Sequence, residues 1–318
     1  MKIAIVTGAF GFAGANLVEH LLQNEYKVYA VGRKKPTAAH NDRFAGTNPD
    51  RLVRVFLEME EYDRLPDYIP EKADVFFHLA WGGGRDDFDA QLKDVDGALK
   101  AIDSAARINP DIRFVGIGSQ AEYGIKSDAE LITEDVSLEP FTAYGSCKAA
   151  AFYLLKSRAM ALNIDFIWGR IFSLIGRYEP EGRMFPDLVR RLYNGEKISL
   201  SSCEQYWDYL DAGDCADAII ALGERGRAGE AYNLANGNFK PLKDYVLEAA
   251  RIVEDLKKTG NEHTYESLEG LISFGKKAEP FVSLRPSVDK ICRDTGWRAR
   301  RTLQDSIREY GLETMENK

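Results

Sequence analysis

The stretch that decides the fold stands near the amino terminus and reads Lys2-Ile-Ala-Ile-Val-Thr-Gly-Ala-Phe-Gly-Phe-Ala-Gly14. Residues 3–6 form an apolar run without alternation, which is typical of a strand buried on both faces of a parallel sheet. A glycine turn follows and leads into a helical run at residues 15–23. This order places backbone N–H groups at the start of a helix, where they can bind the pyrophosphate of a dinucleotide.

The three glycines of this turn have distinct roles. Gly8 permits the tight turn, Gly11 lets the backbone approach the phosphates, and Gly14 lets the helix pack closely on the strand. We therefore expect all three to contact the cofactor, together with Phe10 and Phe12. An ordinary glycine turn is the alternative, but the context of strand and helix argues against it.

The end of the second expected strand, residues 27–31, bears on which dinucleotide is bound. An acid at this position binds the adenosine ribose 2′-OH of NAD. This chain has Gly-Arg-Lys-Lys at residues 32–35, three cations and no acid. Arg33 and Lys34 are therefore predicted to bind a 2′-phosphate, which favours NADP(H), with NAD(H) possible. A solvated basic turn is the alternative.

Further strands alternate with helical segments. They are expected at residues 52–57, 74–79, 112–117 and 165–172, with an amphipathic helix at 89–107. This alternation predicts an α/β fold with a Rossmann-type doubly wound parallel sheet, which binds ligands beyond the carboxyl ends of its strands. The residues expected to contact the cofactor there are Glu58, Met59, Leu79, Ala80 and Phe172. His78 is expected to be a packed core residue rather than a catalyst.

A tyrosine and a lysine four residues apart, Tyr144 and Lys148, are expected on one face of a helix. A nearby ammonium favours the phenolate and lowers the phenol pKa from about 10, so that the pair can exchange a proton near neutral pH. Ser119 ends the fifth expected strand and could hydrogen-bond a substrate oxygen beside Tyr144. A surface tyrosine on a lysine stem and a simple turn serine are the alternatives.

The pattern changes after the sixth strand. Short helices and strands follow in a smaller mixed lobe, and residues 257–277 read as polar and loop-rich. We expect a cofactor-binding domain at residues 1–168 and a substrate-binding lobe at 169–318, with residues 209–230 returning to the first domain.

Composition restricts the class of protein. The chain has 318 residues, 45% hydrophobic, and a net charge of −8, which indicates a globular protein and argues against nucleic-acid binding. Its apolar runs are shorter than the ~20 residues of a membrane helix, and its amino terminus lacks a signal-peptide pattern. Four widely spaced cysteines predict reduced thiols and a cytoplasmic location. Four histidines without ligand spacing make a metal site unexpected.

Taken together, these motifs resemble the extended short-chain dehydrogenase/reductases, in particular the NAD-dependent epimerase/dehydratase branch. The resemblance covers nearly the whole chain. The matching segments are the glycine turn at residues 7–14, His78-Leu-Ala80, Ser119 with Tyr123-Gly124, Tyr144-x-x-x-Lys148, Arg170 with Phe172 and Gly176, Trp207-Asp-Tyr with Asp214, Tyr232-Asn-Leu234 and Gly296-Trp297.

The resemblance implies a nucleotide-diphosphate sugar as the substrate, with NAD(P) carrying hydride at sugar C4. Tyr144 would be the acid/base, Lys148 would hold the nicotinamide ribose, and Ser119 would bind the reacting oxygen. Dehydratases of the family have an Asp-Glu pair just after the Ser119 position. Here Gln120 and Ala121 stand there, which disfavours dehydration.

The segments that bind the sugar diphosphate also depart from the family pattern. Asp94 and Ser173 stand where asparagines are usual, and Trp207 replaces an arginine. The later phosphate-binding arginine falls near Lys276-Lys277, with Arg285 further on. The expected substrate-binding residues are Ser119, Gln120, Ser173, Arg183, Trp207 and Lys277.

The basic segment after the second strand favours a reductase that exchanges NADPH at each turnover, acting on a nucleotide-linked 4-keto-6-deoxy sugar. The alternatives are a nucleotide-sugar 4-epimerase, a carbonyl reductase for a non-sugar substrate, and a cofactor-sensing binding protein without catalysis. The helices at residues 89–108 and 143–160 carry extra apolar stripes. Family members often dimerise through these two helices, so we expect a homodimer; plain core packing is the alternative.

Overall fold

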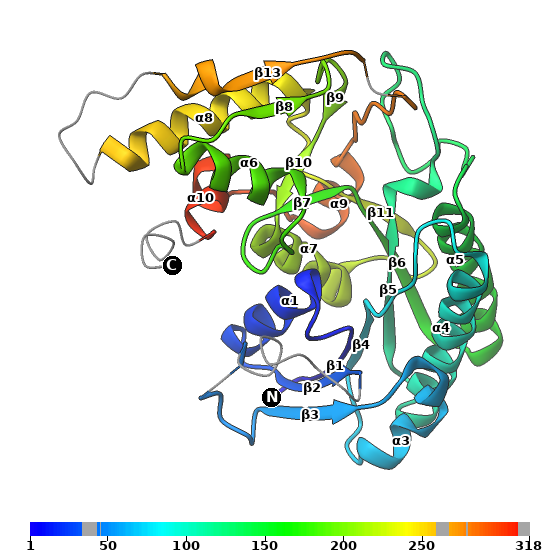
Figure 1. Ribbon diagram of the computed structural model, residues 1–318. Helices are drawn as coiled ribbons and strands as arrows, with labels where there is room; N and C mark the ends of the chain where they lie inside the picture. Colours follow the sequence, from blue (N-terminus) through cyan, green and yellow to red (C-terminus); the bar gives the residue numbers. More distant parts are fainter. Residues whose placement is uncertain (34–42, 45, 259–266, 278, 311–318) are drawn as a thin grey trace.

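The computed structural model describes residues 1–33, 43–44, 46–258, 267–277 and 279–310. Its centre is a seven-stranded parallel sheet in the order β11-β6-β5-β4-β1-β2-β3 (Figure 1). The strands are β1 (Ile3–Thr7), β2 (Lys27–Gly32), β3 (Leu52–Phe56), β4 (Val75–His78), β5 (Arg113–Ser119), β6 (Asp165–Ile171) and β11 (Ala231–Leu234). The strand order reverses between β1 and β4, which confirms the predicted doubly wound sheet.

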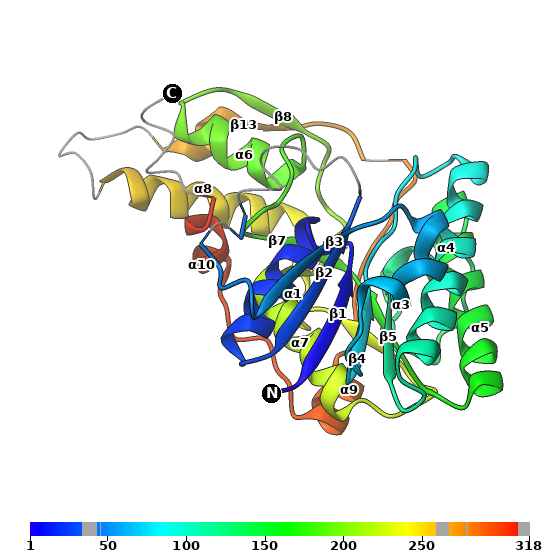
Figure 2. The same ribbon diagram turned by 90° about the horizontal axis from the view of Figure 1, so that it is seen from below.

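Helices cover both faces of this sheet (Figures 1 and 2). One face carries α1 (Phe12–Gln23), α7 (Ala212–Arg225) and α9 (Asp289–Thr295). The other carries α4 (Phe88–Ile108), α5 (Ala143–Leu162), the 3-10 helix η1 (Met59–Arg64) and α3 (Leu65–Tyr68). A separate apolar core lies on each face, so the strands between them are buried on both sides, as their unbroken apolar sequences predict.

The smaller lobe is built on a third core, in which α6 packs against α8. Its helices are α6 (Met184–Tyr193), α8 (Leu242–Lys258), η3 (Leu268–Leu271) and α10 (Leu303–Arg308). Its strands form three pairs, β7 (Ser173–Ile175) with β10 (Tyr209–Asp211), β8 (Ile198–Leu200) with β13 (Ile272–Phe274), and β9 (Tyr206–Trp207) with β12 (Lys240–Pro241).

One segment of the lobe differs from the sequence-based expectation. The described part of 257–277 holds η3 and β13, and β13 pairs in parallel with β8 because Ile272 and Phe274 pack on the lobe core. Helix α7, on the large sheet, begins at Ala212 because the Asp211 carboxylate caps it by accepting hydrogen bonds from the N–H groups of Gly213 and Asp214.

The chain after residue 168 contributes to both parts of the molecule. Helix α7 packs against α1, and β11 extends the large sheet beside β6. The domain boundary that the sequence suggests at residue 168 therefore stays a prediction.

Candidate active site

The glycine turn between β1 and α1 has the close approaches that the sequence predicts. Gly8 has a φ of +68°, and a Cβ on it would lie 2.8 Å from the backbone nitrogen of Ala80. A Cβ on Gly14 would lie 2.1 Å from the carbonyl oxygen of Gly8. Helix α1 therefore packs directly on the turn, and Gly11 caps its start without any side chain in the way.

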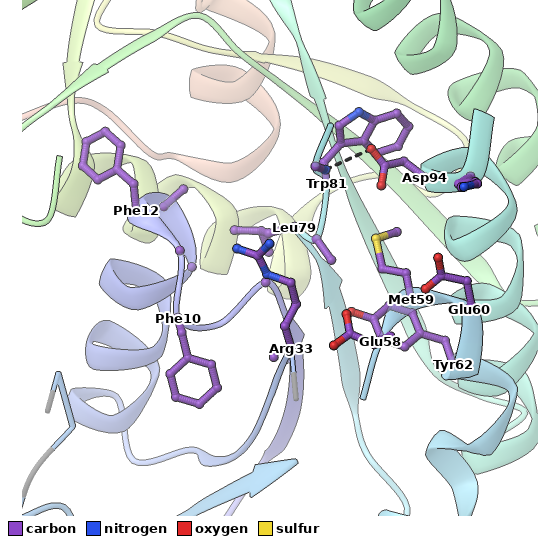
Figure 3. A pocket seen from close by; sticks show the side chains of 18 residues that line it. Phe10, Phe12, Arg33, Glu58, Met59, Glu60, Tyr62, Leu79, Trp81 and Asp94 are labelled. Atoms are coloured by element: carbon purple, nitrogen blue, oxygen red, sulfur yellow. Dashed lines mark hydrogen bonds between the residues drawn. The ribbon is translucent and has the colours of Figure 1, made fainter. Parts of the chain in front are cut away.

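A cavity of about 480 Å³ opens at this turn, beyond the carboxyl ends of β1, β2 and β4 (Figure 3). The predicted cofactor residues that line it are Gly8, Phe10, Gly11, Phe12, Gly14, Arg33, Glu58, Met59, Leu79 and Ala80. Phe172 lies elsewhere, in a small cluster with Tyr123 whose ring centroid is 6.1 Å away. Lys34 is outside the described residues.

The Arg33 side chain is exposed and extends across this cavity toward Leu79 (Figure 3). It follows Gly32, the last residue of β2, so no carboxylate stands at the position where one would bind a ribose 2′-OH. The cation is therefore placed where a ligand phosphate could reach it.

Trp81 and Asp94, which follow β4, also line the cavity, and Trp81 was not predicted from the sequence to do so. The Trp81 indole donates a hydrogen bond of 2.7 Å to Gln91, which fixes the plane of the ring. Asp94 accepts one of 2.9 Å from the Gly82 N–H, and burial raises the pKa of this carboxyl. A tryptophan directly after the His-Leu-Ala segment was the available signal for the missed Trp81.

The residues predicted to be catalytic lie where β5 and α5 meet, and we call this place the candidate reaction centre. Thr142 caps α5 by accepting a 3.1 Å hydrogen bond from the Gly145 N–H, and Tyr144 and Lys148 follow on that helix. Ser119 ends β5, and its side chain shares a hydrogen bond with Tyr144. The three residues predicted to be catalytic therefore come from two elements and converge.

Burial raises the pKa of Tyr144 above its usual value. The hydrogen bond with Ser119 and the positive charge of Arg85 oppose this rise. Arg85 was not anticipated; its guanidinium carbon lies 5.0 Å from the Tyr144 ring centroid, and its carbonyl accepts a bond from the Tyr144 N–H. The sequence predicted that Lys148 would lower this pKa, whereas here a buried phenol keeps its proton at neutral pH.

Lys148 is buried and makes two contacts. Its ammonium donates a 2.6 Å hydrogen bond to the carbonyl of Ile117 and lies 3.7 Å from the Trp81 ring centroid. Burial lowers the pKa of this lysine to about 7. The site therefore holds an amine that titrates near neutrality one helical turn after the tyrosine.

A buried ionic cluster lies beneath Ser119, and its pairing was not predicted from the sequence. Glu122 accepts hydrogen bonds from the Ser119 N–H at 2.8 Å, from Trp168 at 3.1 Å and from Arg170 at 2.7 Å. Arg170 also donates to the hydroxyl of Tyr123. This cluster fixes the end of β5, and so the backbone that carries Ser119.

His78 is a packed core residue, as predicted. It hydrogen-bonds the Thr7 hydroxyl at 2.9 Å, and burial lowers its pKa to about 3. The ring is therefore neutral in the folded protein. Its contact with Thr7 ties β4 to β1 below the cavity.

The residues predicted to bind the substrate are spread over several elements. Gln120 follows Ser119 in η2 (Gln120–Glu122), Ser173 begins β7, and the charge of Arg183 at the start of α6 is close enough to lower the pKa of Tyr144. Trp207 lies in β9 against Tyr209.

Lys277 lies further away, 3.5 Å from the ring centroid of Phe281. Arg285 stacks on Tyr206 and Phe239. The structure thus gathers Gln120 and Arg183 around the reaction centre, and it places Trp207 and Lys277 in the smaller lobe.

The described residues contain no group of three or more His, Cys, Asp or Glu side chains that could hold a metal ion. Among the same residues, no helix is both long and apolar enough to cross a membrane.

Comparison with known proteins gives matches over the whole chain. A dTDP-glucose 4,6-dehydratase of Neisseria gonorrhoeae is 25% identical, covering 100% of this chain and 96% of that protein. The dTDP-glucose 4,6-dehydratase of Bacillus anthracis in complex with NAD superposes with a TM-score of 0.83 at 20% identity, covering 99% and 97% of the two chains. RMD of Pseudomonas aeruginosa complexed with NADPH superposes with a TM-score of 0.78 at 21% identity, covering 99% of this chain and 100% of that chain.

The family model described as "NAD dependent epimerase/dehydratase family" matches residues 4–235, from β1 to the residue after β11. That range contains the glycine turn, the cavity beside it and the cluster of Ser119, Tyr144 and Lys148. The chain therefore belongs to the NAD-dependent epimerase/dehydratase family of nucleotide-sugar-modifying enzymes.

Proposed function

We propose that this protein is an NADPH-dependent reductase of a nucleotide-diphosphate 4-keto-6-deoxyhexose. NADPH, when bound in the cavity beside the glycine turn, supplies a hydride to the keto carbon. Tyr144 donates its phenolic proton to the carbonyl oxygen, and Ser119 hydrogen-bonds the same oxygen. Lys148 holds the nicotinamide ribose and returns the proton to the tyrosine. The products are NADP⁺ and the alcohol.

The arrangement of Tyr144, at the start of α5, beside Ser119, at the end of β5, is the observation that carries this proposal. A reduction needs a proton donor at the start of the reaction, and burial keeps the phenol protonated. An oxidation would need the phenolate first. A buried phenol beside a serine hydroxyl therefore suits the reductive direction.

The cofactor end of the site supports NADPH. Arg33 extends into the cavity at the end of β2, and no acid stands at that strand end to bind a ribose 2′-OH. A guanidinium contact with a phosphate is a charge-assisted hydrogen bond, which is worth about 1.5–3 kcal/mol.

The residues after Ser119 argue against dehydration. Gln120 and Ala121 carry no carboxylate, and Glu122 cannot replace one because its oxygens are occupied by the Ser119 N–H, Trp168 and Arg170. The site thus lacks a second acid/base beside the serine, which elimination of water would need.

The proposal is tested by incubating the protein with NADPH and a panel of nucleotide 4-keto-6-deoxy sugars. We expect oxidation of NADPH with one of them and formation of the 4-hydroxy sugar. Isomerisation of a nucleotide sugar without loss of NADPH would identify a 4-epimerase instead. Turnover of simple ketones alone would identify a non-sugar reductase, and cofactor binding without turnover of any substrate would identify a binding protein.

We also propose that two copies associate through α4 and α5. These helices pack side by side and leave Leu92, Tyr153 and Met160 with 57%, 60% and 76% of their surface exposed. Apolar side chains this exposed on adjoining helices fit a four-helix contact with a second copy. Light scattering at micromolar concentration should give twice the mass of one chain. A Met160→Glu variant should give the mass of a single chain. The cytoplasmic location expected from the sequence stays a prediction.

A further inference from the structure

Phe10 occupies the space directly over Gly32. A Cβ built on Gly32 would lie 2.4 Å from Cδ2 and 2.8 Å from Cε2 of the Phe10 ring. These distances are well below any van der Waals contact, so no side chain fits at position 32 while the ring stays in place. Both residues line the cavity beside the glycine turn.

The Phe10 ring is held on two sides. The centroids of the Phe44 and Phe56 rings each lie 5.7 Å from it, and only 5% of Phe10 is exposed. Its backbone is held as well, since Arg43 donates a hydrogen bond to the Phe10 carbonyl. The Phe10 ring therefore cannot change its rotamer to admit a larger residue at position 32 without losing these packing contacts.

Position 32 matters because it ends β2, where an acidic side chain would accept a hydrogen bond from the ribose 2′-OH of NAD. We propose that Phe10 is a cofactor-specificity residue, which restricts position 32 to glycine. It gives the ribose pocket an apolar wall and leaves Arg33 to select the phosphate. This inference rests on the proposed use of NADPH and assigns the selection to two coupled residues of the turn and the strand.

The coupling makes a specific prediction about substitutions. Gly32→Asp alone should not create an NAD enzyme, because the new Cβ pushes the ring and with it the glycine turn. Phe10→Ala with Gly32→Asp gives the carboxylate room, so it can accept a bond from the ribose 2′-OH and repel a 2′-phosphate. The two changes together should therefore do what neither does alone.

The experiment titrates NADPH and NADH, by their own fluorescence, against the wild type, Gly32→Asp, Phe10→Ala and the double variant. Gly32→Asp should weaken both cofactors about tenfold or more, as overpacking does. The double variant should bind NADH at least about tenfold more tightly than Gly32→Asp does, and NADPH about tenfold more weakly than Phe10→Ala does. Gly32→Ala, which adds the Cβ without charge, should resemble Gly32→Asp in weakening both cofactors.

Thermal melting of the same proteins gives a second readout. If Gly32→Asp does not fold, recovery of a cooperative transition in the double variant supports the coupling, and failure to recover overturns it. Tight NADH binding by Gly32→Asp alone, equal to that of the double variant, also overturns the role of Phe10. A wild type that prefers NADH refutes the proposed cofactor, whereas the comparison of the single and double variants still decides the coupling.

Discussion

The two ends of the site are built in different ways. The cofactor end is formed by β1, the turn after it and the ends of its neighbouring strands, all in one rigid sheet. The residues expected to bind the substrate come from four short elements, η2, β7, α6 and β9. The geometry of the cofactor end is therefore determined mainly by local sequence. The geometry of the expected substrate end is determined by the packing of the lobe onto the sheet.

The candidate reaction centre combines both kinds of construction. Ser119 and Tyr144 stand at the junction of β5 with α5, but their environment comes from residues distant in the sequence. Arg85 stacks on the phenol, and Trp81 covers the amine of Lys148. The protonation of Tyr144 and Lys148 thus depends on neighbours from other segments of the chain.

The largest expected effect is at the reaction centre itself. Tyr144→Phe removes only the hydroxyl and should lower turnover by about 100- to 10,000-fold, because positioned proton transfer is lost. Folding and NADPH affinity should stay close to wild type, since the ring and its packing remain. Tyr68→Phe, at an exposed tyrosine of α3, is the control. Near-normal turnover of Tyr144→Phe would refute its role as proton donor.

The next effect concerns the pH dependence of stability. The Lys148 pKa falls from 10.5 to about 7 on folding, so between these values the unfolded chain binds a proton that the folded chain does not. The free energy of unfolding should therefore rise with pH across that window, by on the order of 5 kcal/mol from this group.

Lys148→Met should remove this rise, which urea unfolding at a series of pH values can measure. Lys156→Met, at a partly exposed lysine of the same helix, should keep it. An unchanged slope in Lys148→Met would show that the amine is not desolvated as described.

Glu122 tests whether the buried cluster supports the reaction centre. Glu122→Gln leaves the Arg170 charge buried without its partner and should cost about 3–5 kcal/mol of stability. Glu269→Gln, at an exposed ion pair with Arg251, should cost less than about 1 kcal/mol. If denaturant unfolding shows that both variants lose the same free energy of unfolding, the Glu122–Arg170 pair contributes no more than a surface ion pair.

The smallest expected effect is at the cofactor end. Arg33→Ala should weaken NADPH binding by about 10- to 150-fold, equivalent to 1.5–3 kcal/mol, and leave NADH binding nearly unchanged. Arg298→Ala, an exposed arginine after α9, is the control. Parallel loss of both cofactors on titration would mean that Arg33 shapes the pocket rather than reads a phosphate.

Much of the fold and of the cofactor end could be predicted from the sequence, because their signals are local. An unbroken apolar strand, a glycine turn and a helix specify the geometry around Gly8 and Gly14 directly. The pair Tyr144 and Lys148 is visible for the same reason, since both stand on one helix. These features need only neighbours within a few residues.

The remaining features could not be predicted, because they depend on contacts between distant segments. Trp81 and Lys148 are 67 positions apart, and their contact depends on how α5 packs against α4 and β5. In the sequence, Glu122 is a single acid after an expected strand. Its ion pair with Arg170 forms only because β6 places that arginine beside it. Phe172 was assigned to the cofactor by its place after β6, yet its ring turns into the cluster with Tyr123.

The most direct test of the central claim follows the hydride. The enzyme is incubated with NADPH carrying deuterium at the transferable position of nicotinamide C4 and with the nucleotide 4-keto-6-deoxy sugar that it turns over. We expect one deuterium on C4 of the product sugar and one NADP⁺ per product molecule, detected by mass spectrometry and NMR. A product without deuterium, formed with no net oxidation of NADPH, would contradict it.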